Sequence, residues 1–196
     1  MDGAWLVAGL GNPGERYAKT RHNAGAMVVE RLCDRFAVKL KKVRFSPVLA
    51  ADVRREGLRF LLVQSGAWMN ESGPPIASFA KRRRIPVDRI VACHDEIDLA
   101  FGTLRVKRGG STAGHHGLES LERALGSNDF YRVRIGVGRP ARREQNVDWV
   151  LKPFAKREQD DAALLIEEAA DAVVSLATAG LERTQERFNR SVLEPR

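Results

Sequence analysis

Apolar runs typical of β-strands alternate with segments of helical periodicity along most of this chain of 196 residues. In residues 28–36, apolar side chains recur every three or four positions, which predicts a helix. Residues 49–55 and 59–64 are strand-like, and the Glu56-Gly57 turn between them predicts a hairpin. Because a hairpin joins antiparallel strands, the sheet is expected to be mixed. The alternation predicts an α/β fold in which helices flank a twisted mixed β-sheet.

The same patterns predict the remaining elements and a single globular domain. Further strands are expected at residues 5–8, 89–93, 104–107 and 131–137, and further helices at 72–84, 116–125, 160–178 and 181–189. No repeat or linker divides the chain, so we expect one domain over residues 1–190 and a short tail over 191–196. No run of eighteen apolar residues occurs, and no membrane segment is expected. Cys33 and Cys93 form no C-x-x-C pair, which favours reduced thiols in a cytoplasmic protein. We expect a monomer with no obligate protein partner.

Positive charge is concentrated in one part of the chain. The formal net charge is +8, and residues 105–157 hold 12 Lys and Arg against 5 Asp and Glu, a net +7. A localised basic surface suits a polyanion, most often a nucleic acid. The alternative is a solvated basic face without a partner.

The first strand is followed by glycines in the pattern G-x-G-x-x-G, at Gly9, Gly11 and Gly14. This spacing alone is typical of dinucleotide-binding proteins, and an NAD-dependent oxidoreductase is one alternative. That class needs an acidic residue at the end of a second strand, whereas Glu30 and Asp34 fall in a segment of helical periodicity. The polar stretch after the glycines also carries His22 and Asn23, which a phosphate site does not need, and Asn23 is expected to cap the helix that follows.

Polar clusters follow the apolar strands, where α/β proteins tend to bind their ligands. They are Asn12 with His22, then 68–70 (Trp-Met-Asn), 94–96 (His-Asp-Glu) and 114–117 (Gly-His-His-Gly). A neutral histidine can take a proton from water, and a carboxylate on its other nitrogen fixes the tautomer. Asparagine amides can donate to a developing oxyanion. These residue types suit the hydrolysis of an ester.

Simpler interpretations exist for each cluster. His22 can be a surface histidine, Asp95 can cap a turn, and the histidine pair can be the first turn of a helix. A zinc or manganese site is a further alternative, built from His22, His94, Asp95, His115 and His116. No metal-binding spacing such as H-E-x-x-H supports it.

Six motifs occur in a fixed order along the chain. They are GLGNPG with TRHNAG (9–25), WMNESG (68–73), HDEIDL (94–99), GG to GHHGL (109–118), RIGVGRP (134–140) and VLKPF (150–154). In sequence and order they resemble the motifs of bacterial-type peptidyl-tRNA hydrolases. The resemblance implies a single α/β globule that cleaves the ester between a peptide and the terminal ribose of tRNA, without metal or other cofactor. The alternative is a non-catalytic RNA-binding relative of the same fold.

The resemblance also implies roles for individual residues. His22 resembles the family's general base and Asp95 the carboxylate that supports it, while Asn12 resembles the residue that helps to tell blocked from free aminoacyl-tRNA. The positions implied to contact the substrate are Tyr17, Trp68, Asn70 and His116. His116 departs from the family pattern, which more often has Asn there. For the tRNA backbone we expect contacts from Arg105, Lys107, Arg108, Arg142 and Arg143.

Overall fold

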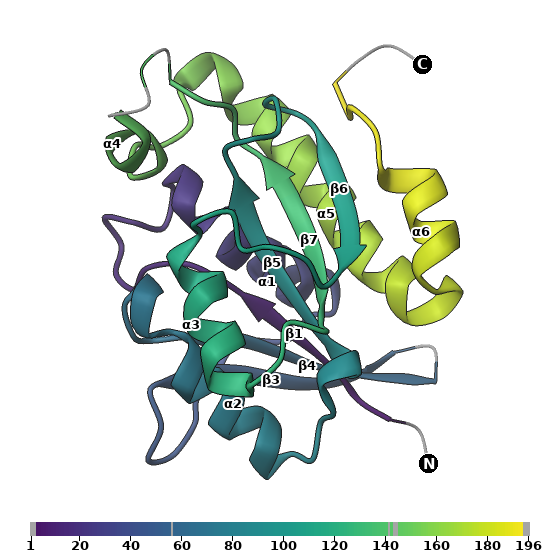
Figure 1. Cartoon of the computed structure of the whole chain (residues 1–196). Coiled ribbons are helices and arrows are strands. Elements are labelled where there is room, and N and C mark those ends of the chain that lie inside the picture. The colour runs from purple at the N-terminus through teal and green to yellow at the C-terminus, as the bar shows by residue number, and fades with distance from the viewer. Residues whose placement is uncertain (1–2, 56, 141, 143–144, 194–196) are drawn as a thin grey trace.

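A seven-stranded mixed sheet forms the centre of the computed structural model, which describes residues 3–55, 57–140, 142 and 145–193 (Figure 1). The strand order is β2-β3-β4-β1-β5-β7-β6. The strands are β1 (Trp5–Gly9), β2 (Lys41–Lys42), β3 (Val48–Arg55), β4 (Leu58–Ser65), β5 (Ile90–Glu96), β6 (Leu104–Arg108) and β7 (Tyr131–Gly136). The helices are α1 (Ala24–Arg35), α2 (Gly73–Arg82), α3 (His116–Leu125), α4 (Asn146–Val150), α5 (Gln159–Ala179) and α6 (Leu181–Phe188).

Parallel pairing joins β4, β1, β5 and β7, and antiparallel pairing adds β3 with β2 at one edge and β6 at the other. Arg55 pairs with Leu58 at the end of the β3–β4 ladder, and Gly57 has a φ of +79°, as a tight turn requires. The predicted hairpin and the mixed sheet are therefore confirmed, although Glu56 lies outside the described residues.

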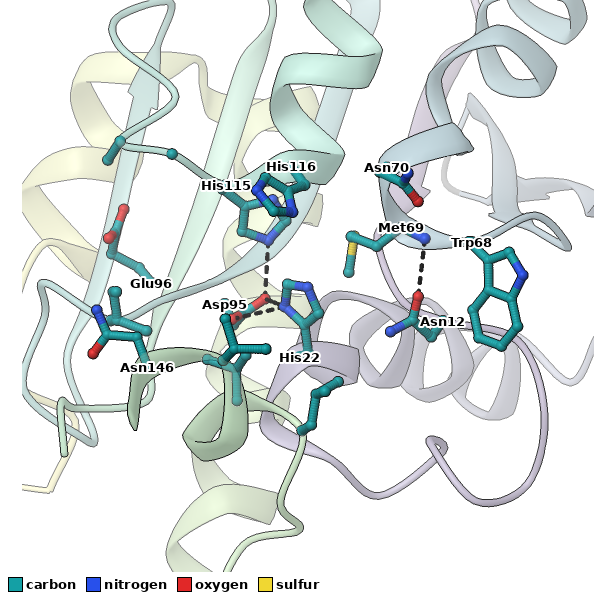
Figure 2. A pocket seen from close by; sticks show the side chains of 16 residues that line it. Asn12, His22, Trp68, Met69, Asn70, Asp95, Glu96, His115, His116 and Asn146 are labelled. Carbon is teal, nitrogen blue, oxygen red and sulfur yellow. Dashed lines mark hydrogen bonds and ion pairs between the residues drawn. The ribbon is translucent and has the colours of Figure 1, made fainter. Parts of the chain in front are cut away.

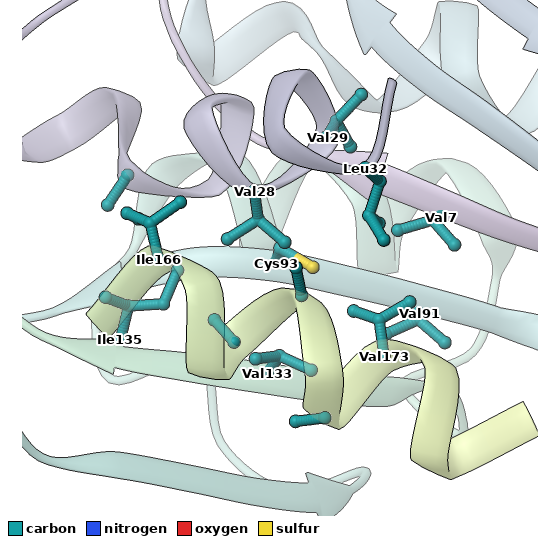
Figure 3. Close-up of a cluster of buried hydrophobic side chains, with 14 of the residues drawn as sticks. Val7, Val28, Val29, Leu32, Val91, Cys93, Val133, Ile135, Ile166 and Val173 are labelled. Carbon is teal, nitrogen blue, oxygen red and sulfur yellow. The ribbon is translucent and has the colours of Figure 1, made fainter. Parts of the chain in front are cut away.

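Helices cover both faces of the sheet, and each face has its own apolar core. Along β1, Trp5 and Val7 pack into the core under α1 and α5, which Figure 3 shows in part. Leu6 and Ala8 point to the opposite face and pack into the core under α2 and α3. Because both faces are buried, β1 is apolar throughout rather than alternating. The predicted α/β fold with flanking helices is confirmed.

Several helix ends have a local cause that the sequence predicted. Pro74 and Pro75 occupy the first turn of α2, where a missing amide N–H costs nothing. Gly126 ends α3 in the left-handed conformation with φ +68°. Asn23 occupies the N-cap position of α1, but the hydrogen bond predicted for its side chain is wrong, because that side chain bonds to the backbone of Asn12 instead.

Other differences concern where elements end. β5 continues three residues beyond the predicted Cys93, so that the segment His94 to Glu96 is buried strand rather than the loop after a strand. The short elements β2 and α4 were not predicted. Ser191 forms an isolated β-bridge with Thr103, directly before β6, so the chain remains in contact with the rest of the fold beyond residue 190. The division into residues 1–190 and a tail stays a prediction. Within the described residues, the longest helices are too short or too polar to cross a membrane.

Candidate active site

The carboxyl ends of β1, β4 and β5 meet at one edge of the sheet. Gly9 pairs with Gln64 on one side and with Cys93 on the other, so the polar segments after these strands begin side by side. A cavity of about 460 Å³ lies there. Among its lining residues are six that the sequence predicted: Asn12, His22, Trp68, Asn70, Asp95 and His116. Figure 2 shows how these side chains converge.

His22 lies in a single 3-10 turn, η1 (Arg21–Asn23), between β1 and α1. Its Nδ1 is 2.9 Å from Asp95 Oδ1 and 3.1 Å from Oδ2. An ionised carboxylate only accepts hydrogen bonds, so Nδ1 carries the proton and Nε2 keeps its lone pair. The side chain of Asp95 is 2% exposed, whereas that of His22 is 15% exposed. The sequence-predicted pair thus meets in space, with Nε2 of His22 free to act as a base.

His115 is a third member of this group, and the sequence analysis gave it no role beyond the alternative metal site. Its Nε2 lies 3.0 Å from Asp95 Oδ1, so one carboxylate serves two histidines. Its Nδ1 accepts the backbone N–H of Leu118 at 3.3 Å and caps α3. Because Nδ1 is an acceptor there, Nε2 holds the proton and donates it to Asp95. One signal in the sequence could have identified His115 as a helix cap. It is a polar residue directly before the predicted helix at 116–125, and N-cap residues occupy that position.

Opposing effects set the pKa values of His22 and Asp95. Burial lowers the pKa of His22, but the charge of Asp95 and its hydrogen bond together raise it by more, to above the usual 6.5. Burial raises the pKa of Asp95, and the charges and hydrogen bonds of His22 and His115 lower it by a larger total, well below its usual range. Asp95 is therefore ionised at neutral pH and stabilises a proton on His22.

His94 is buried beneath this group and stays neutral. Its Nδ1–H donates to the carbonyl oxygen of Asp95 at 2.7 Å, and its ring packs edge-on to His115 with centroids 5.0 Å apart. Burial and the neighbouring His115 hold the pKa of His94 well below its usual value. A neutral imidazole that donates to the backbone of Asp95 fixes the position of that residue without adding charge.

The metal alternative from the sequence can be tested on the donor set. His22, Asp95 and His115 bring one ligand atom each to within 4.8 Å of one another. The nitrogen of His115 that faces Asp95 is Nε2, which carries a proton while Nδ1 caps α3. A protonated ring nitrogen has no lone pair for a metal. The geometry fits a hydrogen-bonded group in which the carboxylate accepts from both histidines.

Asn12 has a defined orientation because a backbone donor fixes its amide. Its Oδ1 accepts the N–H of Met69 at 2.9 Å, so the NH₂ group is the part left to face the cavity. Asn23 holds the Asn12 backbone from both sides, accepting from its N–H and donating to its carbonyl, each at 2.9 Å. In Figure 2 the amide nitrogen of Asn12 lies on the His22 side. Asn12 therefore presents a fixed hydrogen-bond donor to the cavity.

The predicted substrate-contact residues lie around the mouth of the cavity. Trp68 is 50% exposed, and Tyr17 packs edge-on against it with ring centroids 5.7 Å apart, just outside the lining. Asn70 and His116 are exposed and line the cavity. The opposite wall consists of Val147, Val150 and Leu151 from α4 and the residue after it, and sequence reasoning assigned no role to them.

The basic residues predicted for the tRNA backbone are partly grouped. Arg105 and Lys107 lie on β6 opposite Arg134 and Arg132 of β7, which concentrates positive charge at this edge of the sheet. Arg108 is on the same strand, but its guanidinium pairs with both carboxylate oxygens of Asp129 at 2.8 and 2.7 Å. Arg142 is exposed. Arg143 lies outside the described residues.

Comparisons with known proteins agree with this fold. A family model described as peptidyl-tRNA hydrolase matches residues 6–196. A peptidyl-tRNA hydrolase from Frankia alni is 47% identical over 188 residues, and the match covers 96% of this chain and 95% of the relative. One from Kineococcus radiotolerans is 43% identical over 196 residues, and the match covers 96% of this chain and 98% of that relative. A crystal structure of peptidyl-tRNA hydrolase from Acinetobacter baumannii superimposes with a TM-score of 0.90 at 33% identity, over 96% of each chain. The chain belongs to the peptidyl-tRNA hydrolase family.

Proposed function

We propose that His22 is the general base with which this protein hydrolyses the ester bond of peptidyl-tRNA. The observation that carries the proposal is the bond from His22 Nδ1 to the buried Asp95 carboxylate, which leaves Nε2 unprotonated at the cavity. A base must lie within hydrogen-bond reach of the water it activates, and Nε2 faces the space where a substrate fits. Asp95 plays the supporting part, since it fixes the tautomer and stabilises the imidazolium that forms.

The reaction uses groups on both sides of the scissile ester. Nε2 takes a proton from water as the oxygen attacks the carbonyl carbon, and the Asn12 NH₂ donates to the oxyanion that develops. The imidazolium then returns the proton to the leaving ribose oxygen, so that tRNA and a peptide with a free carboxyl group are released. General base catalysis typically contributes about 10²–10⁴ in rate and one oxyanion donor about 10²–10³. These factors suffice for an ester, whose leaving group is an alcohol.

Around this centre, further residues hold the substrate. We assign Asn70, His116, Trp68 and Tyr17 to the peptide and the terminal nucleotide, because they surround the cavity mouth. Arg105 and Lys107 contribute to the tRNA backbone contacts, whereas the ion pair with Asp129 makes Arg108 a weaker candidate. Phosphate contacts position a nucleic acid without reading its sequence, which suits an enzyme that accepts many tRNAs. The proposed enzyme is a cytoplasmic monomer that needs no metal.

The decisive experiment compares N-blocked and free aminoacyl-tRNA as substrates. We expect the wild type to release the N-blocked amino acid and to leave the free aminoacyl-tRNA largely uncleaved. His22→Asn keeps a polar side chain of similar size at the position of Nδ1 and removes the base, so it is expected to bind the substrate without cleaving it. A metal chelator is expected to leave the rate unchanged. Undiminished turnover by His22→Asn would refute the assigned base, and loss of activity with the chelator would refute the metal-free mechanism.

A further inference from the structure

Arg21 precedes His22 in the chain, but its side chain serves a different region from the catalytic group. The residue is 3% exposed although it carries a full positive charge. Its Nη1 donates to the Pro153 carbonyl at 2.6 Å, and its Nη2 donates to Glu158 Oε2 at 2.7 Å. The guanidinium also stacks on the ring of Trp149, with Cζ 3.9 Å from the ring centroid. A buried cation with this set of partners binds residues 149–158 to the turn that carries His22.

Trp149 is the part of α4 that this arrangement holds. Its indole N–H donates to the Gly138 carbonyl at 2.9 Å, while its ring lies against Arg21. α4 has only five residues and none of them is buried, so neither helix propensity nor core packing fixes it in place. The contacts of Trp149, together with the backbone bond from the Arg21 N–H to the Lys152 carbonyl at 3.0 Å, therefore fix where α4 lies relative to the cavity.

The wall held in this way is apolar and open to the cavity. We call Val147, Val150 and Leu151 the apolar wall; Val147 is 65% exposed and Leu151 37% exposed. The opposite side of the cavity presents the Asn12 and Asn70 amides. A peptidyl group has a polar main chain, and many residues add an apolar side chain to it. With the amides facing the main chain, the apolar wall is the surface left for the side chain.

We propose that Arg21 is a positioning residue: it holds the apolar wall, through Trp149, where the wall contacts the side chain of the amino acid esterified to tRNA. This inference rests on the proposed function, because it takes peptidyl-tRNA as the occupant of the cavity. It assigns Arg21 no part in proton transfer. Arg21 acts on the affinity for substrates with large apolar side chains, whereas His22 acts on the rate of the chemical step.

A purely structural role for Arg21 predicts a different result from the proposal. Breaking a buried ion pair destabilises a fold in either case, because a charge is left without its partner. If Arg21 served stability alone, its loss would lower the amount of active enzyme and reduce turnover of every substrate equally. If Arg21 positions the wall, its loss raises KM more for a substrate with a large apolar side chain than for one with a small side chain. The dependence of KM on side-chain size separates the two.

The test uses N-acetyl-glycyl-tRNA and N-acetyl-leucyl-tRNA with the full-length protein. For Arg21→Gln we expect KM for the leucyl substrate to rise by at least about tenfold, the usual effect of losing an apolar contact, and KM for the glycyl substrate to change little. Trp149→Leu leaves the ion pair of Arg21 with Glu158 intact and is expected to give the same selective rise. If Arg21→Gln does not fold, this second variant decides the question.

Arg190→Gln is the matched control, since it removes a partly buried arginine whose Nη2 pairs with Glu168 at 2.9 Å away from the cavity. It is expected to lower the melting temperature without changing either KM. An equal fold-change in KM for the two substrates, relative to the wild type, in Trp149→Leu or in a folded Arg21→Gln would overturn the inference. Failure of the proposed function has a separate signature, because His22→Asn would then keep its turnover of both substrates.

Discussion

Replacing Asp95 with asparagine tests the shared carboxylate, because an amide has one acceptor oxygen where a carboxylate has two and puts an N–H donor in place of the other. His115 must donate its Nε2–H to residue 95, since its Nδ1 accepts from Leu118. The amide oxygen then takes the Oδ1 position, and the NH₂ group replaces Oδ2, which lies 3.1 Å from Nδ1 of His22. Two N–H donors would face each other at that distance. The repulsion favours the tautomer with the proton on Nε2, and in that tautomer His22 is not a base for water.

The expected loss follows from the tautomer and from the missing charge. In the serine-protease triad, the same carboxylate-to-amide change lowers kcat by about 10⁴. In Asp95→Asn the amide oxygen takes the place of Oδ1, which lies 2.9 Å from Nδ1 of His22 in the wild type, so His22 can keep this contact. We therefore expect a fall in kcat of about 10²–10⁴. This corresponds to about 3–5 kcal/mol of transition-state stabilisation.

The assay is release of the amino acid from an N-blocked aminoacyl-tRNA at saturating substrate. Asp171→Asn is the control, since Asp171 pairs with Arg35 on the side of the molecule formed by α1 and α5. It removes a carboxylate from an ion pair of similar length and is expected to leave kcat unchanged. A kcat for Asp95→Asn within tenfold of the wild type, with the fold intact by circular dichroism, would refute the assigned role of Asp95.

Three further predictions concern pH, packing and salt. The net effect of burial and of Asp95 is to raise the pKa of His22, so the wild-type kcat/KM is expected to rise with pH through a midpoint above 6.5. In Asp95→Asn only the effect of burial remains, and the midpoint is expected to fall below 6.5. A pH–rate profile of each protein measures the two midpoints. Gly25→Ala is expected to destabilise the fold by more than about 2 kcal/mol in thermal unfolding, because the added Cβ would lie 2.6 Å from the Cys93 carbonyl carbon; an unchanged melting temperature would contradict the packing. Lys107→Ala is expected to raise KM and to lower the slope of log KM against log salt by about one, and an unaltered slope would remove Lys107 from the tRNA contacts.

The strands and long helices were predictable because both faces of the sheet are covered and the pattern is therefore strong. Apolar residues at β1 and helical spacing in α5 reflect burial, which is a property that a sequence encodes directly. The pairing of His22 with Asp95 was expected from the resemblance and from strand ends that lie at one edge of the sheet. The site residues that come after strands were thus found from a general rule of α/β folds.

The features that sequence reasoning missed depend on contacts between distant segments. His115 reaches Asp95 because capping of α3 fixes its ring, and nothing in the local sequence states which carboxylate it meets. α4 has no amphipathic pattern of useful length, and its position depends on Arg21, more than 120 residues earlier in the chain. The hydrogen bond predicted for the Asn23 side chain was wrong for a similar reason, because the side chain satisfies the backbone of Asn12 instead. Tertiary hydrogen bonds override local propensity at these points.

Gly9 and Gly11 of the G-x-G-x-x-G motif owe their presence to packing rather than to a phosphate, and Gly14 serves a turn with a φ of +99°. A Cβ on Gly9 would lie 2.6 Å from the Gly25 carbonyl oxygen and 2.8 Å from Val29, and a Cβ on Gly11 would lie 2.9 Å from the Cβ of Ala26. The missing side chains let α1 approach β1 closely, as the third glycine does in dinucleotide-binding folds. The difference lies in what precedes the helix. Here α1 begins after η1, and the residue presented at the end of the sheet is His22. In a dinucleotide-binding fold, the amide groups of the helix N-terminus would lie there instead.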